Sequence, residues 1–433
     1  MSLAGALRGA PENRKSTSGY DAYVGNYRLA ESHMVGVDRF IDDEGHTTLL
    51  LSDYHSGVVR RLFPVSDTEF VMGPGFDVQS PPELSVRFVR NRQGKVTGVS
   101  LEVANGQVSV AERVPLQEEE VTFYDEDVRL AGTLITPETQ GVHPAIILLH
   151  GSGPLTRYSF GPYPHFFASL GLAVLIYDKR GSGASGGTLL DASTGNLNKL
   201  PAAFYPDDLA NDALAALRFL RERREISAEK IGLWGSSEGG MLTTQVAARS
   251  KDVTFIVNSS GFMGPLWQTI LYQGAAQLRA RGSTEREIEE AAAFNKLWMR
   301  VAQTGEDYEL VLKQRETVIS ENKPWLFWWS RSFGSLEQMR WDWNHILAFS
   351  PLPALKHVSC PTLGVFGELD QSTDAPDAAN SMREVLSVAG NRDVTVKVFP
   401  NANHSLAEMP SGARMAPGVF ETLGSWLRRR ALG

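Results

Sequence analysis

The first quarter of the chain alternates between apolar and polar positions in short runs, which is the pattern of half-buried β-strands. Polar turns separate the runs. The seven runs are Tyr23–Leu29, Thr47–Ser52, Val58–Phe63, Glu69–Met72, Leu84–Arg90, Val96–Glu102 and Gln107–Arg113. Seven or eight short strands at this spacing predict a small all-β domain over residues 20–115, built as a barrel or a sandwich.

The pattern changes after a short acidic stretch, residues 117–120, which we expect to be a linker. A hairpin over residues 120–136 comes next, and apolar strands then alternate with helices. The expected strands are Ala145–Leu149, Ala173–Tyr177, Lys230–Trp234 and Phe255–Asn258, and the expected helices are Pro164–Ser169, Pro206–Arg223 and Glu238–Arg249. This alternation predicts an α/β domain whose mostly parallel sheet is covered by helices on both faces.

Helical periodicity replaces this alternation between about residues 262 and 355. Thr284 and Glu287 have the spacing of a capping box, which predicts a helix that runs to Val301. The alternation then resumes with two strands and a terminal helix, Thr362–Phe366, Val394–Phe399 and Pro417–Arg430. We therefore expect one α/β domain over residues 120–433, interrupted by a helical insertion at 262–355.

Composition and charge narrow the range of partners. The 433 residues are 42% hydrophobic and 21% charged, with a net charge of −8. An acidic chain of this kind is not expected to bind nucleic acid or an anionic membrane surface, and its longest apolar runs are too short to span a bilayer. The single cysteine, Cys360, excludes an internal disulfide and is expected to be a small buried hydrophobe.

Candidate chemistry begins at the pentapeptide Gly235-Ser236-Ser237-Glu238-Gly239, where an apolar strand meets a helix. A G-x-S-x-G sequence in that context makes a tight turn that lifts the central hydroxyl off the end of a sheet. Glycines flank the serine because a Cβ there would collide with the neighbouring strand and helix. Ser237 is the predicted nucleophile, and Ser236 is its neighbouring alternative.

A serine hydroxyl needs a base to remove its proton, and the base needs a third group to hold its tautomer. Asp370 and His404 each follow an apolar strand, in the chain order Ser, Asp, His. Since parallel strands end at one edge of a sheet, we expect both side chains to lie near Ser237. His404 is the predicted base and Asp370 the predicted acid, with Asp374 and Asp377 on the same loop as alternatives for the acid.

Attack on an ester carbonyl places negative charge on its oxygen, and two backbone N–H groups should receive that charge. One is the N–H of Glu238, directly after the nucleophile. The other is expected from Ser152, because Gly151 and Gly153 allow the loop after the strand Ala145–Leu149 to approach closely. We therefore predict an oxyanion hole made by Ser152 and Glu238.

Together these motifs resemble the α/β-hydrolase family, in particular its bacterial esterases and oligopeptidase-related hydrolases. The resemblance covers roughly residues 120–430 outside the insertion. Its motifs are the triad Ser237, Asp370 and His404, the loop His150-Gly-Ser-Gly-Pro154, and Tyr177-Asp-Lys-Arg-Gly-x-Gly-x-Ser185. It implies an α/β-hydrolase fold that needs no cofactor and no metal, with the insertion as a lid.

Two further segments add to this interpretation. Seven of the nine tryptophans lie in residues 262–355, and an aromatic lid favours apolar or aromatic esters of modest size. The substrate-binding candidates there are Trp325, Trp328, Trp329 and Trp341. Residues 23–29, 62–70 and 94–99 resemble small lipocalin-like β domains that are attached to bacterial serine hydrolases. That second resemblance implies a barrel fold, and we expect the barrel to support the chemistry.

The predicted activity is hydrolysis of small-molecule carboxylic esters through an acyl-enzyme, by a monomer or a homo-oligomer. The alternatives are a small-peptide or amide-cleaving peptidase of the oligopeptidase type, an acyl thioesterase, and a binding module that has lost catalysis. Residues 181–186 match G-x-G-x-x-G, but no helix is expected to begin there, so a dinucleotide site is excluded. The first twenty residues lack the apolar core of an intact signal peptide. We expect a soluble protein, either cytoplasmic or exported with its signal peptide removed.

Overall fold

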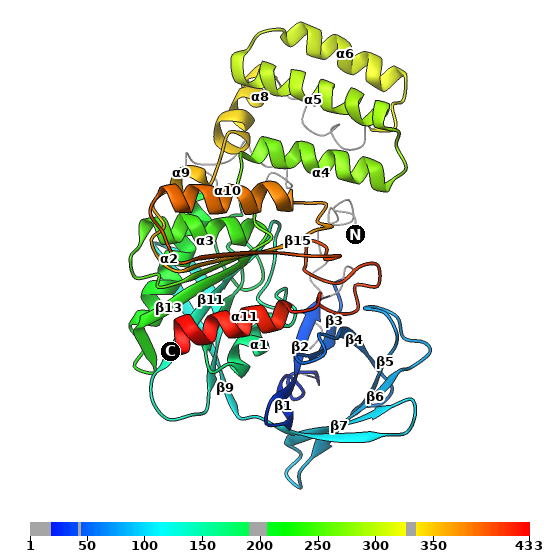
Figure 1. Cartoon of the computed structure of the whole chain (residues 1–433), viewed down its shortest axis with the longest axis vertical. Coiled ribbons are helices and arrows are strands. Elements are labelled where there is room, and N and C mark those ends of the chain that lie inside the picture. The colour runs from blue at the N-terminus through cyan, green and yellow to red at the C-terminus, as the bar shows by residue number, and fades with distance from the viewer. Residues whose placement is uncertain (1–18, 42–44, 190–205, 326–334) are drawn as a thin grey trace.

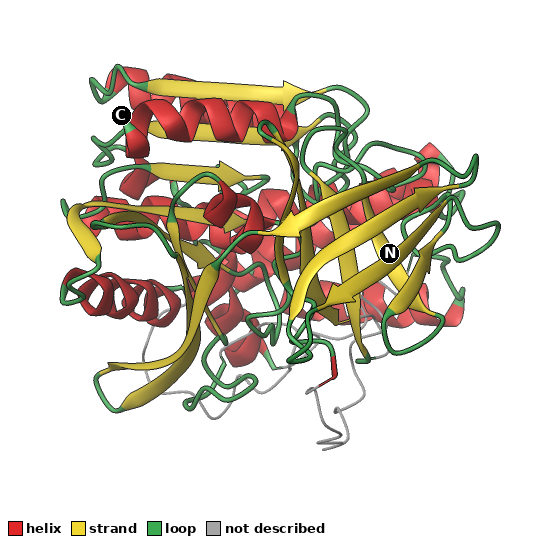
Figure 2. Ribbon diagram, turned by 90° about the horizontal axis from the view of Figure 1, so that it is seen from below, coloured by secondary structure: helices red, strands yellow, loops and turns green. Residues whose placement is uncertain are grey.

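Eight antiparallel strands near the N-terminus close into a barrel (Figures 1 and 2). The structure is a computed structural model that describes residues 19–41, 45–189, 206–325 and 335–433. The barrel strands are Gly25–Ala30 (β1), His33–Ile41 (β2), Thr47–Asp53 (β3), Val59–Pro64 (β4), Glu69–Met72 (β5), Leu84–Arg90 (β6), Val96–Val103 (β7) and Val108–Arg113 (β8). The all-β prediction is confirmed, and the closed barrel fits the lipocalin-like resemblance.

Strand β2 is the barrel strand that the sequence pattern did not single out. Its inward side chains, Val35 and Val37, are apolar and fully buried, but Gly36 lies between them and the charged Asp38 and Arg39 follow, so no alternating run was recognised. One of these, Asp38, points outward and is nevertheless buried, because His165 of the α/β domain contacts it. A strand with a buried ionic outer face therefore has no simple apolar–polar alternation.

An eight-stranded mixed sheet forms the second β structure. Its strands are Leu116–Asp125 (β9), Val128–Pro137 (β10), His143–Leu149 (β11), Ala173–Tyr177 (β12), Ile226–Ser236 (β13), Ile256–Ser259 (β14), Thr362–Gly367 (β15) and Val394–Phe399 (β16). Their order across the sheet is β16-β15-β14-β13-β11-β12-β10-β9. The six strands from β11 to β16 run parallel, and β9 and β10 add an antiparallel edge.

The acidic stretch 117–120 is not the linker that the sequence suggested. Residues 117–120 form the first half of β9 and pair with β10, from Thr136 back to Thr133. Arginines of the α/β domain bind these carboxylates: Arg157 contacts Glu120 at 2.6 Å, and Arg223 contacts Glu119. Because cationic partners are supplied from distant parts of the chain, local charge alone gave the wrong prediction.

Helices cover both faces of the sheet, as predicted (Figure 2). One face is covered by three helices, Asp207–Arg221 (α2), Glu238–Arg249 (α3) and Ala375–Val388 (α10). The other face is covered by two, Tyr163–Ser169 (α1) and Val419–Leu427 (α11). Helix α11 continues as a π-helical turn, Arg428–Leu432 (η5). The core of the first face includes Leu217 and Met382, and the core of the second includes Phe167 and Trp426.

A group of helices is inserted between β14 and β15. Its members are Leu266–Ala280 (α4), Glu285–Thr304 (α5), Tyr308–Ser320 (α6), Leu336–Asp342 (α8), a π-helical turn at Trp343–Leu347 (η4) and Leu352–Leu355 (α9). The predicted capping box is present, since the Thr284 and Glu287 side chains each accept the other's backbone N–H. In Figure 1 α4, α5, α6 and α8 lie beyond α10, and the barrel lies on the opposite side of the sheet.

The barrel is docked on the α/β domain by apolar and ionic contacts. Strand β3 is buried on both faces: Leu49 and Leu51 point into the barrel, whereas Leu50 joins the core shared with α1 and α11. His165 Nδ1 donates to Asp38 Oδ1 at 2.5 Å. Burial lowers the pKa of His165, but its contacts with Asp38 and Glu118 outweigh burial and raise this pKa to about 10. The two β structures are therefore joined through a buried cation as well as an apolar core.

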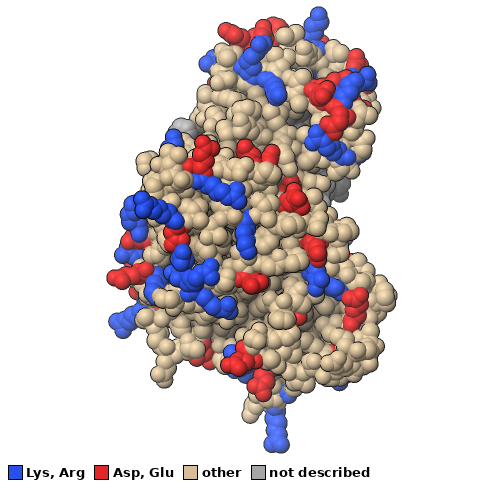
Figure 3. All heavy atoms as spheres, viewed as in Figure 1, with Lys and Arg blue, Asp and Glu red and all other residues tan. Residues whose placement is uncertain are grey.

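The outer surface carries charges of both signs. Acidic and basic side chains are interspersed over the face drawn in Figure 3, without a broad area of one sign. Within the described ranges, no helix combines the length and apolarity needed to cross a bilayer.

Candidate active site

Ser237 occupies a strained turn between β13 and α3. Its backbone has φ 57° and ψ −119°, a conformation that L-residues rarely adopt. A Cβ on Gly235 would lie 2.0 Å from the carbonyl oxygen of Gly239, and a Cβ on Gly239 would lie 2.1 Å from that of Leu149. Only glycine fits at either position. Ser236, in contrast, is the last residue of β13 and is in register with Ser259 of β14.

Asp370 and His404 are brought together by two neighbouring strands. Asp370 follows β15, His404 follows β16, and His404 Nδ1 donates to Asp370 Oδ2 at 2.7 Å. The Asp370 side chain is fully buried, whereas that of His404 is 28% exposed. Since a carboxylate only accepts, the proton of the neutral imidazole lies on Nδ1, and Nε2 is left able to take a proton.

The alternative acids lie at the start of α10, where Asp374 is the N-cap and Asp377 is in the first turn. Asp374 is the N-cap of α10, where its Oδ1 accepts the backbone N–H of Asp377 at 3.2 Å. Asp370 Oδ1 accepts the backbone N–H groups of Ser372 and Thr373 at 2.7 and 2.9 Å. These two bonds fix the carboxylate so that its second oxygen meets His404.

A chain of hydrogen bonds connects the Ser237 turn to the Asp370 loop through the end of β14. The Ser237 N–H donates to the carbonyl oxygen of Ser259 at 2.8 Å. The Thr373 hydroxyl donates to the carbonyl oxygen of Ser260 at 2.8 Å, and the Thr373 N–H donates to Asp370. The predicted nucleophile and acid are therefore held to the same strand end, and the acid contacts the predicted base.

The loop after β11 packs directly against the serine turn. A Cβ on Gly151 would lie 3.4 Å from the Cβ of Ser237, so this loop closely approaches the predicted nucleophile. His150 anchors the loop: its Nε2 donates to the carbonyl oxygen of Tyr177 at 2.6 Å, and its ring stacks on Phe160 at 4.0 Å. Burial lowers the pKa of His150 to about 3, so this histidine is neutral and shapes the loop.

Lys179 joins the two segments that carry the predicted oxyanion donors. Its Nζ donates to the carbonyl oxygen of Gly151 at 2.9 Å and to Glu238 Oε2 at 2.5 Å. Both charged side chains are only 4% exposed. Gly151 precedes Ser152, and Glu238 provides the other expected N–H, so Lys179 links the two segments that carry the predicted donors.

Sequence reasoning missed this role of Lys179. The sequence did contain a signal, because a basic residue, Lys179, follows an apolar strand and an acidic residue, Glu238, follows the predicted nucleophile. Only the strand order, with β11 between β12 and β13, shows that these two positions meet.

The loop from Asp178 to Ser185 is braced by charge and does not open a helix. Asp178 accepts the side chain of Arg157 at 3.0 and 3.1 Å, and the backbone N–H of Ala184 at 2.9 Å. Hydrogen bonds with Arg157 outweigh burial and lower the pKa of the Asp178 carboxyl. A Cβ on Gly183 would lie 2.5 Å from Asp178, which explains a glycine there. The glycine-rich motif is therefore a structural turn.

The insertion reaches the site through α4. The Tyr272 hydroxyl donates to the carbonyl oxygen of Asp370 at 2.7 Å, and the Gln273 amide donates to that of Ser372 at 3.0 Å. Sequence reasoning missed both residues because it considered only the tryptophans of this region. They occupy consecutive positions of α4, and two adjacent polar side chains carry no such signal in the sequence.

The predicted substrate-binding tryptophans are distributed differently. Trp325 is 2% exposed and packs on Phe294 inside the insertion, with ring centroids 5.6 Å apart. Trp341 stacks on His345 at 4.4 Å. Trp328 and Trp329 lie outside the described residues. A role for these tryptophans in binding substrate stays a prediction.

A cavity of about 570 Å³ lies beside the serine turn, between the α/β domain and the barrel. On the α/β side its wall includes Gly151, Ser236 and Ser405. The barrel side includes residues from β2, β3, β4 and the segment after β5, among them Phe40, Leu50, Val59 and Phe76, and also His46 just before β3. Neither Trp325 nor Trp341 lines it.

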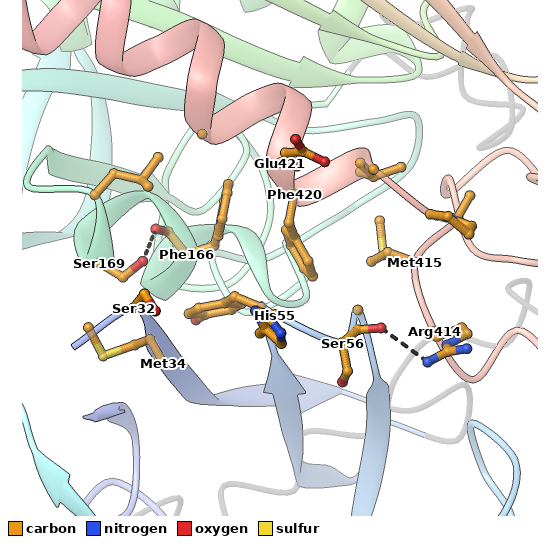
Figure 4. Close-up of a pocket in the computed structure, with 18 of the residues that line it drawn as sticks. Ser32, Met34, His55, Ser56, Phe166, Ser169, Arg414, Met415, Phe420 and Glu421 are labelled. Atoms are coloured by element: carbon orange, nitrogen blue, oxygen red, sulfur yellow. Dashed lines mark hydrogen bonds between the residues drawn. The ribbon is translucent and has the colours of Figure 1, made fainter. Parts of the chain in front are cut away.

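A second cavity, of about 590 Å³, lies between the barrel, α1 and α11 (Figure 4). The side chain of Arg414 donates to the carbonyl oxygen of Ser56 at 3.1 Å at one end of it. Arg414 and Met415 line both cavities and so form the partition between them. None of the predicted catalytic residues lines this second cavity.

No metal site accompanies these groups in the part of the chain that the structure describes. There, no three His, Cys, Asp or Glu side chains cluster in a way that would hold a metal ion.

Comparison with known proteins identifies a family and several similar proteins. The "Alpha/beta hydrolase family" matches residues 146–414. Esterase EstD of Thermotoga maritima is 30% identical over 179 residues, 39% of this chain and 39% of EstD, so the chain matches about two fifths of EstD's length. Acylamino-acid-releasing enzyme 1 of Oryza sativa is 34% identical over 288 residues, 66% of this chain and 30% of that enzyme. An esterase structure from Pyrococcus furiosus has 18% identity and a TM-score of 0.46, covering 73% of this chain and 92% of its own.

Proposed function

Because this chain belongs to the alpha/beta hydrolase family, we propose that it is a serine hydrolase that cleaves carboxylic esters through an acyl-enzyme. One observation carries the proposal: Ser237 stands on a strained glycine-flanked turn whose hydrogen bonds lead to the Asp370–His404 pair. A strained conformation persists only where the surrounding structure holds it, and such positions cluster at active sites. The nucleophile, base and acid thereby have the roles that acyl transfer requires.

In the proposed reaction, His404 Nε2 takes the proton of the Ser237 hydroxyl while the serine oxygen attacks the ester carbonyl. The backbone N–H groups of Glu238 and Ser152 receive the charge on the carbonyl oxygen. His404 then gives its proton to the departing alcohol, and an acyl group remains on Ser237. A water molecule, activated by the same imidazole, releases the acid and restores the serine. Asp370 stays ionised throughout and holds the imidazolium in place.

The named relatives support an ester substrate, since EstD is called an esterase. A second candidate is cleavage of an acylated amino acid or small amide, supported by the match to an acylamino-acid-releasing enzyme over 66% of this chain. Both reactions pass through the same acyl-enzyme and differ in the leaving group. A thioesterase is the remaining alternative, because an acyl-enzyme also forms from a thioester. The leaving-group preference therefore has to be measured.

Covalent labelling with a fluorophosphonate tests the nucleophile. We expect the parent protein and Ser236→Ala to label, and Ser237→Ala to remain unlabelled while keeping its fold. Loss of labelling in Ser236→Ala alone would move the nucleophile by one residue. A folded parent protein that does not label at all would contradict the proposed serine hydrolase and favour a binding module.

A substrate panel tests the reaction class: p-nitrophenyl esters, aminoacyl anilides and acyl thioesters, each compared by kcat/KM. We expect the esters to have the highest values. Ser237→Ala should lower kcat for the best substrate by on the order of 10⁴ or more. A higher kcat/KM for the anilides would replace the esterase by a peptidase, and a higher value for the thioesters would replace it by a thioesterase.

A further inference from the structure

The cavity between the two β structures is lined by the chain neighbours of the proposed nucleophile, of one oxyanion donor and of the base. Ser236 precedes the nucleophile, Gly151 precedes the oxyanion donor Ser152, and Ser405 follows the base His404. No other cavity described above touches these three segments. A group bound there lies beside the segments that carry the proposed nucleophile, one oxyanion donor and the base.

The wall opposite these segments comes from the outer face of the barrel. Side chains alternate along a strand, and in β3 Leu49 and Leu51 fill the barrel while Leu50 points outward to the cavity. Val59 of β4 lies on the same outer face, and its N–H donates to the carbonyl oxygen of Ala413 at 3.0 Å. The wall is therefore anchored to the segment that follows His404 and has a fixed position relative to the base.

The chemistry of this wall favours an apolar ligand. Phe40 and Phe76 meet edge to face on the barrel side, with ring centroids 5.8 Å apart, and Phe160 and Trp234 line the α/β side. Arg61 and Asp77 form an ion pair at 2.9 Å at the barrel side of the cavity, so their charges compensate each other. A cavity of about 570 Å³ is within the range that encloses small organic ligands, and its mostly apolar wall matches such sites.

We propose that the barrel forms one wall of the substrate pocket, and that this cavity holds an apolar group of the ester that Ser237 attacks. The inference rests on the proposed function and assigns substrate selection to the barrel face Phe40, Leu50, Val59 and Phe76. The apolar group belongs either to the acyl part or to the alcohol part of the ester. The same apolar contacts serve both, and the experiment distinguishes them.

Two variants change the cavity in opposite senses. Val59→Phe fills it, and Phe76→Ala enlarges it, at a side chain that is only partly buried and so tolerates truncation. Val110→Phe is the matched control, because Val110 is 63% exposed on β8 and does not line the cavity. Thermal melting of each variant establishes that it is folded before kinetics are measured.

Two substrate series are compared by kcat/KM: p-nitrophenyl esters from acetate to decanoate, and acetate esters of progressively larger alcohols. In one of the two series, Val59→Phe should lower the ratio of kcat/KM for the bulkiest substrate to kcat/KM for the smallest by about tenfold or more. A small volume change in an apolar pocket has an effect of this size. Phe76→Ala should raise the same ratio, and Val110→Phe should leave it unchanged. A response in the p-nitrophenyl series places the acyl group in the cavity, and a response in the acetate series places the alcohol there.

Unchanged ratios in both series for folded Val59→Phe and Phe76→Ala would overturn the proposal, as would an equal change in Val110→Phe. If Val59→Phe does not fold, Phe76→Ala decides alone. Failure of the proposed function has a different appearance: the parent protein would neither label with fluorophosphonate nor hydrolyse any member of either series.

Discussion

Removing the buried amino group of Lys179 tests how the two oxyanion donors are held in place. In Lys179→Met, the Glu238 carboxylate, 4% exposed, loses the cation 2.5 Å away, and the Gly151 carbonyl loses a donor. Removing one member of a buried ion pair costs about 3–5 kcal/mol, because the other charge is left uncompensated. We therefore expect the free energy of unfolding to fall by that amount.

Catalysis should suffer separately from stability. Lys179 holds the Gly151 carbonyl and the Glu238 side chain, so its loss releases the loop of Ser152 relative to the start of α3. Complete removal of one oxyanion donor costs on the order of 10²–10³ in kcat. We expect kcat to fall by up to that factor with KM little changed, since the donors act mainly on the transition state.

Urea unfolding followed by tryptophan fluorescence gives the stability, and ester hydrolysis well below the melting temperature gives kcat. Lys230→Met is the matched control: Lys230 Nζ donates to the carbonyl oxygen of Gly433 at the exposed surface, so this change should stay within about 0.5 kcal/mol of the parent. The double variant Lys179→Met/Glu238→Met should regain most of the lost stability, because both charges of this buried pair are removed together. A Lys179→Met protein that unfolds within about 1 kcal/mol of the parent and keeps its kcat would refute the reasoning.

Three further predictions follow from the site and the domain junction. Asp370→Asn should lower kcat strongly, whereas Asp374→Asn should leave kcat unchanged. Asp374→Ala should cost about 1 kcal/mol of stability through loss of a helix cap. Ester hydrolysis and urea unfolding of the three variants test this, and equal losses of kcat in Asp370→Asn and Asp374→Asn would contradict Asp370 as the acid. The pKa of His165 is raised to about 10, so its stabilising charge is present below pH about 6.5 and is lost as the pH rises toward 10. The free energy of unfolding should therefore fall as the pH rises over this range, and Asp38→Asn should make this fall smaller. An equal fall in the parent and in Asp38→Asn would show that the His165–Asp38 pair does not form. Gly239→Ala should fail to accumulate as folded protein, because its Cβ would lie 2.1 Å from a carbonyl oxygen; a soluble variant with normal melting would contradict the geometry.

Local patterns in the sequence predicted the strand–turn–helix around Ser237 and the positions of Asp370 and His404. Strand β12 and helix α3 begin and end at the expected residues, because their apolar spacing is regular and their flanking turns are clear. The order of the strands places both loops at the same edge, which general rules for parallel sheets already imply. The sequence therefore predicted an acid near His404 but left Asp374 and Asp377 as alternatives, and the structure shows that Asp370 makes the contact.

Contacts between distant segments could not be predicted in the same way. The apolar run Leu49-Leu50-Leu51 does not alternate, which is the mark of a strand buried on both faces. Residues 47–52 were nevertheless predicted as a half-buried strand, so the packing of Leu50 against the α/β domain was not predicted. Likewise, Lys179 and Glu238 are 59 positions apart, and only the neighbouring positions of β12, β11 and β13 bring them together.

The barrel's outer face has a consequence for the order in which this protein is synthesised. Val59 leaves the ribosome early, but its backbone partner Ala413 is made about 350 residues later. At roughly 5–20 residues per second, Leu50 and Val59 wait on the order of 20 to 70 s for the C-terminal segment that covers them. A completed barrel with a bare apolar face thus precedes the rest of the molecule on every nascent chain. Translation speed and holding chaperones should therefore govern the yield of this protein more than they would for a chain whose first domain is finished on its own.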